Sequence, residues 1–138
     1  MKKILFLTIL ILFGMQAIAD QYVPEFNEMQ TIRCDIKETL YNSDNSVVST
    51  TEYHRIFNLD DPSQKIYLQK APVDWLLYYG DDQIKFTLQP LADDYMMTSS
   101  VILDRTNNTY NAKTEITYDN PAFGVRHSEA SGICKPLN

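Results

Sequence analysis

The residues from Leu103 to Ala112, LDRTNNTYNA, include the side chains of this chain that are best suited to chemistry. An acid and a base stand next to each other, an Asn-Asn-Thr glycosylation sequon follows, and a tyrosine comes after it. The residues concerned are Asp104, Arg105, Asn107, Asn108 and Tyr110. A charged pair beside a tyrosine could bind a polar ligand, whereas two asparagines between apolar strands are typical of a tight turn. The segments on either side decide between a site and a hairpin.

Two histidines and three aspartate doublets are the other candidates for catalysis or metal binding. His54 and His127 are the only imidazoles, and neither lies in a nucleophile motif such as G-x-S-x-G. The doublets Asp60-Asp61, Asp81-Asp82 and Asp93-Asp94 lack the spacing of a calcium loop and lie in turns, where aspartate caps backbone donors. We therefore predict no catalytic residue, no metal site and no cofactor. A small hydrolase that uses carboxylates alone stays open as an alternative.

The segment from Val73 to Tyr79, VDWLLYY, is the most apolar part of the chain beyond its first residues. Trp75, Tyr78 and Tyr79 could line a pocket for a small apolar ligand or form an exposed patch for a protein partner. A nearly continuous apolar run is also typical of a strand that is buried on both faces. We favour this buried strand and keep the two binding alternatives.

The first 19 residues have the three parts of a secretory signal peptide. A start with two lysines precedes the apolar run Ile4–Phe13, and the junction of Ala19 and Asp20 follows a small-x-small cleavage motif. The apolar run is too short to cross a bilayer, which takes about 20 residues. We expect export to the periplasm or the exterior of a bacterial cell, no membrane insertion after cleavage, and a single domain over residues 20–138.

The chain is acidic, and cleavage makes it more so. Removal of residues 1–19 takes away two lysines and no acidic residue, which changes the formal net charge from −6 to −8. An acidic protein displaces no counterions from nucleic acid, so we exclude nucleic acid as a partner. The same charge would steer a basic protein toward this chain.

Cys34 and Cys134 are the only cysteines, and in an exported chain they indicate one disulfide. A bridge that closes a loop of about 100 residues stabilises the fold by about 4.7 kcal/mol in the chain-entropy model. It also requires the two Cα atoms to lie within about 7 Å of each other. The first and last strands must therefore meet.

Apolar and polar residues alternate through most of the chain, which predicts strands and no helix. The clearest case places Ile84, Phe86 and Leu88 against polar neighbours, and the segments Tyr95–Asp104, Thr109–Tyr118 and Val125–Cys134 are predicted strands. About eight short strands with turns at regular spacing predict an all-β antiparallel meander. Because the ends must meet, we expect a small up-and-down barrel closed by the disulfide, with a β-sandwich as the alternative.

Several short motifs recur at matching places in this layout: Ile-Arg-Cys at Cys34, Phe-Asn-Leu-Asp at Asp60, D-x-I-x-F from Asp82, the LDRT hairpin and Gly-Ile-Cys at Cys134. The layout resembles a type of small exported bacterial all-β protein of unknown function, in which glycine commonly stands where this chain has Asn108. The resemblance implies a fold and a compartment, not an activity. A looser likeness to periplasmic lysozyme inhibitors rests on a cysteine near each end, but the chain lacks their Ser-Ala-Ser-Gly-like loop.

The hairpin is the interpretation we favour for LDRTNNTYNA. A two-residue type I′ turn at Asn107 and Asn108 pairs Arg105 with Tyr110, and Leu103 with Ala112. Asp104 then points to the opposite face from Arg105, whose guanidinium lies over the Tyr110 ring. We thus expect these residues to set the register of two strands.

The leading function hypothesis is a non-enzymatic binding or interaction domain whose partner is an unknown protein or a small apolar ligand. Three alternatives remain: an inhibitor of a basic hydrolase such as lysozyme, a carrier of small apolar ligands, and the carboxylate hydrolase. Electrostatic steering by the acidic chain favours the inhibitor among them.

Overall fold

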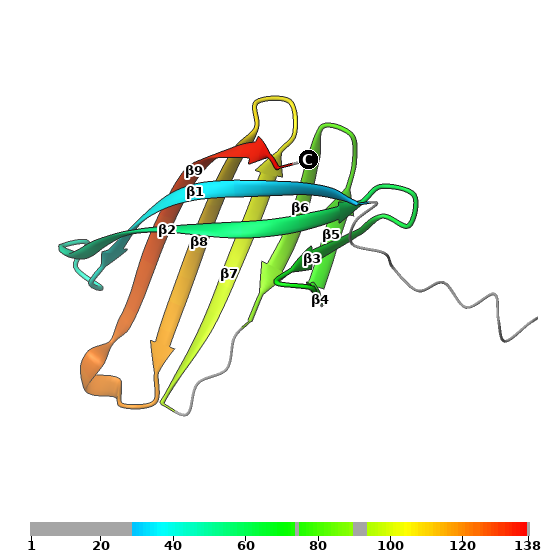
Figure 1. Cartoon of the computed structure of the whole chain (residues 1–138). Coiled ribbons are helices and arrows are strands. Elements are labelled where there is room, and N and C mark those ends of the chain that lie inside the picture. The colour runs from blue at the N-terminus through cyan, green and yellow to red at the C-terminus, as the bar shows by residue number, and fades with distance from the viewer. Residues whose placement is uncertain (1–28, 74, 90–93, 138) are drawn as a thin grey trace, which may run out of the picture.

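A computed structural model describes residues 29–73, 75–89 and 94–137 of the 138-residue chain (Figure 1). The expected signal peptide and its cleavage site between Ala19 and Asp20 lie outside the described residues. Within the described ranges, no helix is long and apolar enough to cross a membrane.

The described chain is almost entirely strand. The strands are β1 Gln30–Tyr41, β2 Val47–Asp60, β3 Lys65–Leu68, β4 Ala71–Pro72, β5 Trp75–Tyr79, β6 Gln83–Leu88, β7 Tyr95–Asp104, β8 Thr109–Tyr118 and β9 Val125–Pro136. A short 3-10 helix, η1 Pro121–Phe123, begins after Asn120, whose side chain accepts a hydrogen bond from the Ala122 amide. The predicted bounds of the Tyr95–Asp104 and Thr109–Tyr118 strands are confirmed, and the last strand extends two residues beyond its predicted end.

All nine strands form one antiparallel sheet in the order β4-β3-β2-β1-β9-β8-β7-β6-β5. Every strand pairs with its successor in the chain except β4 with β5, and β1 pairs with β9. Figure 1 shows that the sheet curls so strongly that β1 and β2 run across the strands β9 to β6. We call β1–β4 the first wing and β5–β9 the second wing.

The prediction of an all-β antiparallel meander with one disulfide is confirmed. The curled sheet forms a half-barrel. The first and last strands of the chain, β1 and β9, pair with each other, and we call this pair the closed junction. Its two edges are β4 and β5, and we call the gap between them the open junction.

The disulfide lies at the closed junction. Cys34 of β1 and Cys134 of β9 stand directly opposite each other in the register, with Cα atoms 4.0 Å apart. Both residues are buried. The bridge therefore joins neighbouring strands that are 100 residues apart in sequence.

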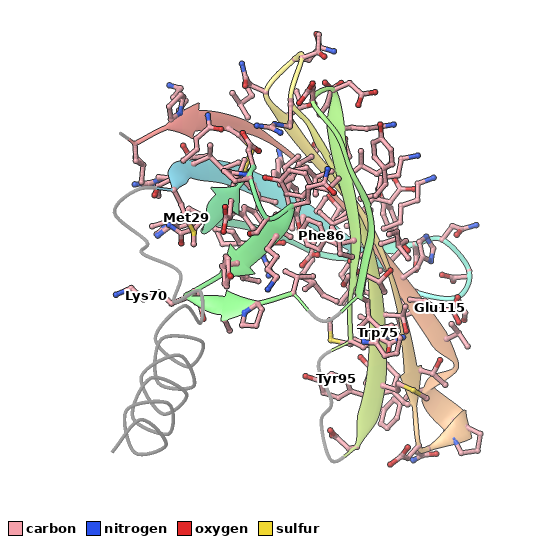
Figure 2. The ribbon with its side chains drawn as sticks, turned by 90° about the vertical axis from the view of Figure 1, so that its right-hand side faces the viewer. Met29, Lys70, Trp75, Phe86, Tyr95 and Glu115 are labelled. Carbon is pink, nitrogen blue, oxygen red and sulfur yellow. A yellow bond between two sulfur atoms is a disulfide. The ribbon has the colours of Figure 1, made fainter. Side chains whose placement is uncertain are left out.

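The core lies between the two wings, where alternate residues of each strand face one another. The first wing contributes Phe57, Leu59 and Ile66, and the second contributes Phe86 and Tyr110, among others. Phe57 packs edge-on against Phe86 with ring centroids 5.7 Å apart and lies 6.2 Å from the Tyr110 ring. In Figure 2, Phe86 lies between the wings while Glu115 extends from the outer side of the second wing. The alternation of apolar and polar residues in the sequence thus places the apolar side chains on the inner face of the sheet and most polar side chains on the outer face.

Candidate functional site

The β7–β8 hairpin has a different turn from the one predicted. Asp104 pairs with Thr109 and Leu103 pairs with Tyr110, so four residues, not two, form the loop. Of the two asparagines, only Asn108 has a positive φ, at 55°. The type I′ turn was therefore wrong, and the register is shifted by two residues. A shift of two keeps every side chain on its expected face.

The Asp104 side chain accounts for the longer loop. Its Oδ1 accepts hydrogen bonds from the backbone amides of Thr106 and Asn107, both at 3.0 Å, and its Oδ2 accepts one from the Asn107 side chain. These bonds lower the pKa of the Asp104 carboxyl, with the Asn107 side chain as the largest cause. Because the carboxylate holds the turn, Asp104 acts as a local cap.

Arg105 does not lie over Tyr110, as predicted, but reaches across the open junction. One terminal nitrogen lies 3.0 Å from a carboxylate oxygen of Asp61 in the β2–β3 turn, and the other donates to the carbonyl oxygen of Gly80. The guanidinium lies over the Tyr79 ring at 5.7 Å from its centroid. The prediction failed because the two-residue register shift moved Arg105 into the loop, free of a partner on β8.

Asp61, Tyr79 and Arg105 form a three-residue cluster that we call the clasp. The Tyr79 hydroxyl donates to Asp61 at 2.6 Å, so the carboxylate accepts from both partners. The hydrogen bond from Arg105 lowers the pKa of Asp61, while burial and the nearby Asp61 charge raise the pKa of Tyr79. Asp61 and Arg105 thus stabilise each other's charged form, and Tyr79 stays protonated beside them. The clasp joins the β2–β3 turn of the first wing to β5 and the β7–β8 hairpin of the second wing.

Tyr110 is a core residue, with 2% of its surface exposed. Burial raises the pKa of its hydroxyl, so the ring stays neutral at ordinary pH. Its neighbour across the pair is Leu103, which is also buried. Of the hairpin residues, Asp104 and Asn108 shape the turn, Tyr110 fills the core, and Arg105 belongs to the clasp.

The strand β5 is exposed, which makes the favoured interpretation of a strand buried on both faces wrong. Trp75 is 57%, Leu77 69% and Tyr78 46% exposed, whereas Leu76 and Tyr79 pack against the core. The physical reason is twofold. First, β5 is an edge strand, so it has a neighbouring strand on one side. Second, a bulge between Leu76 and Tyr78 adds one residue to the strand, and the consecutive side chains of Leu77 and Tyr78 therefore both face outward.

A small cavity of about 180 Å³ with a mixed lining lies beside Trp75 at the open junction, where Leu68, Pro72, Val73 and Leu88 meet the polar residues Thr87 and Gln89. Typical small-molecule sites are larger, about 300 to 1,000 Å³. The space between the wings is filled by the fully buried side chains of Phe57, Phe86 and Tyr110, among others. This geometry favours binding at the surface of β5 over binding inside the half-barrel.

The two histidines lie at separate places on the sheet, whereas the doublets Asp60-Asp61 and Asp81-Asp82 both lie near Arg105. His54 lies opposite Asp35 on the β1–β2 pair, and His127 of β9 stacks on Tyr41 with ring centroids 5.0 Å apart. The buried Asp60 holds the hydroxyl of Ser63. Asp82 accepts from the Tyr78 hydroxyl at 3.3 Å, and Asp93 lies outside the described residues.

Among the residues that the structure describes, no group of three or more His, Cys, Asp or Glu side chains is placed to hold a metal ion. No protein-family model matches this chain, and comparisons with curated proteins and with solved structures also find no match.

Sequence reasoning missed the clasp, since its members lie in two turns and on one strand that are far apart in the chain and carry no common motif. It kept the exposure of β5 only as an alternative to a buried strand, because a run of apolar residues is the same in a core strand and in an edge strand.

Proposed function

We propose that this chain is an exported, non-enzymatic interaction domain that binds a protein partner through the exposed surface of β5. The observation that carries the proposal is the exposure of three large apolar side chains, Trp75, Leu77 and Tyr78, within four consecutive positions. Tryptophan and tyrosine are the residues most often found as binding anchors. On the other strands of the second wing, Met96, Ile102, Val125 and Ile133 are also exposed, but as single residues, whereas the exposed side chains of β5 lie together.

The disulfide supports this function in a second way. A domain joined at its closed junction by a covalent bond can present apolar side chains at its open junction without relying on them for stability. Oxidised cysteines are typical of exported proteins. The partner would therefore belong to the periplasm or the exterior of the cell.

A capture experiment tests the proposal. Wild type, a W75A/Y78A double variant and an I133A control are immobilised and exposed to an exported protein fraction. Ile133 is a matched control because it is 63% exposed and lies on β9. We expect wild type and I133A to retain the same partner and W75A/Y78A to lose it. Equal retention by all three proteins, or retention by none, contradicts the proposal.

The loss of binding must not come from unfolding. Because Trp75 and Tyr78 are exposed, their truncation is expected to change the free energy of unfolding by under about 0.5 kcal/mol each. Urea denaturation of the oxidised proteins, followed by far-UV circular dichroism, checks this. A large loss of stability in W75A/Y78A would support a core role for β5 instead.

A second candidate function is inhibition of a basic hydrolase such as lysozyme. The observation that favours it is a group of exposed carboxylates next to β5, comprising Asp61, Asp81 and Asp82, in a chain with a formal net charge of −6. Electrostatic attraction speeds such associations and weakens with salt. We expect dose-dependent inhibition of lysozyme at low ionic strength that declines as salt is added. Full lysozyme activity at a large excess of this protein removes the candidate.

A further inference from the structure

We infer that the partner supplies an extended, basic peptide segment that pairs with β5 as a tenth strand of the sheet. This inference rests on the proposed function and names the chemistry of its partner. Within the described residues β5 is the last strand of its wing, since it pairs with β6 on one side and with no strand on the other. We call the side without a partner strand the free edge.

The free edge offers backbone hydrogen bonds that a partner strand could take. An unpaired strand edge is a template for another chain, and peptides that add to it gain affinity from main-chain hydrogen bonds. Natural proteins usually protect such an edge with lysine, proline or inward-pointing charge, and also with bulges such as the one between Leu76 and Tyr78. The first three features are absent here, since the described residues of β5 are Trp75, Leu76, Leu77, Tyr78 and Tyr79. The opposite edge of the sheet, β4, is only two residues long and includes Pro72.

The two edge strands of the sheet thus differ in length and composition. β4 is short and carries a proline, which donates no backbone hydrogen bond. β5 is longer and apolar, with Trp75, Leu77 and Tyr78 exposed, while β3 approaches the strand and Asp61 contacts Tyr79 at its end. Figure 2 looks onto this side of the molecule. The small cavity beside Trp75 gives an incoming side chain a place to pack at the start of β5.

The charge beyond β5 determines which segment fits. Asp81 and Asp82 follow β5 directly and are exposed, and Tyr78 donates to Asp82. Both aspartates raise the pKa of Tyr78, Asp82 more strongly, which places their charge at this end of the strand. Asp61 is nearby but is already paired with Arg105. Within the described residues neither Asp81 nor Asp82 forms a salt bridge. Their negative charge at the end of an apolar edge is complementary to a segment with lysine or arginine beside apolar residues.

The single tryptophan of the chain provides the readout, because Trp75 lies on β5 and its fluorescence changes when the edge is covered. The probe is a synthetic heptapeptide of alternating lysine and valine. Two controls match it: a peptide in which glutamate replaces lysine, and a lysine-valine peptide with alternate amides N-methylated so that one edge cannot donate hydrogen bonds.

We expect the lysine-valine peptide to shift the Trp75 emission saturably and the glutamate peptide to have no effect. The N-methylated peptide should bind at least about tenfold more weakly, since one of its edges can no longer donate main-chain hydrogen bonds to β5. A D81N/D82N variant should bind the lysine-valine peptide several-fold more weakly at low salt and almost equally at high salt. I133A serves as the variant that should leave binding unchanged.

Three outcomes overturn the inference. Equal binding of the N-methylated peptide, or no binding of the lysine-valine peptide, shows that β5 does not accept a strand. Concentration-dependent dimerisation in sedimentation velocity that W75A/Y78A abolishes shows that the occupant of the free edge is a second copy of this chain. If partner capture still depends on Trp75 and Tyr78 in the first two cases, the proposed function stands and only strand addition fails.

Discussion

The closed and open junctions of this half-barrel are held in different ways. At the closed junction, β1 and β9 pair over ten residue positions and are also joined by the Cys34–Cys134 disulfide. At the open junction, the clasp connects the wings through side chains alone, and Trp75, Leu77 and Tyr78 remain exposed. The strongest connections thus lie where the chain ends meet, whereas at the mid-chain edge the wings are held by the side chains of the clasp.

The largest effect is expected from removal of the disulfide. A C34A/C134A variant should lose about 2 to 5 kcal/mol of unfolding free energy, because the unfolded chain regains the freedom of a long closed loop. Urea midpoints of the oxidised wild type and the variant measure this loss. Reductant should lower the midpoint of wild type and leave that of the variant unchanged. A variant as stable as wild type would show that the closed junction does not depend on the bridge.

Gly132 tests the backbone packing at the same junction. A Cβ atom at this position would lie 2.2 Å from the carbonyl oxygen of Asp35, so the β1–β9 pair must shift to accept it. We expect G132A to lower the free energy of unfolding by about 1 to 3 kcal/mol. S131A, at the exposed neighbouring position, is the matched control and should stay close to wild type. A neutral G132A would mean that the two strands separate easily.

Asn108 links the hairpin to the closed junction, because its carbonyl oxygen accepts a hydrogen bond from the Cys134 amide at 2.7 Å. Its φ of 55° lies in the left-handed region, where a β-branched residue is strained. We expect N108V to cost about 1 to 2 kcal/mol and N108G to be nearly neutral. Thermal unfolding of both variants measures the difference. The opposite order would indicate that the asparagine side chain itself is required.

The clasp should contribute least, because its carboxylate is 54% exposed. The pKa of Asp61 is lower in the fold than in the unfolded chain, so its contribution is present above about pH 4 and is lost as the pH falls through the folded pKa. We expect D61N to be less stable than wild type by under about 1 kcal/mol at neutral pH. The difference should vanish in acid, as measured by urea titrations across that range. A difference independent of pH would show that the ion pair is not its cause.

The sequence was sufficient to predict the features that depend on local pattern. The alternation of Ile84, Phe86 and Leu88 correctly places a strand with one buried face, and the two cysteines correctly bring the chain ends together. The positive φ of Asn108 also follows from its residue type, since asparagine tolerates this conformation better than most residues do.

Features that depend on distant parts of the chain could not be predicted. The partner of Arg105 is Asp61, which is 44 residues away, and no spacing rule connects the two turns. Whether VDWLLYY is a core strand or an edge strand depends on where the sheet stops, which is decided by the pairing of all the other strands. The bulge at Leu77 shifts the register between β5 and β6, and the cap at Asp104 accompanies the shifted register between β7 and β8. Residue types alone specify neither of these features.

The strand order across the sheet is that of a simple meander whose chain ends have been moved from the β4–β5 connection to the β9–β1 pair. Read from β5 to β9 and then from β1 to β4, every strand lies beside the one that follows it. A circular permutant that begins at Trp75, ends at Val73 and joins β9 to β1 by a short link would therefore keep all the strand pairs. Its contacts would become local, so it should fold faster than the natural order. Its disulfide would close a much shorter loop and would stabilise the fold less.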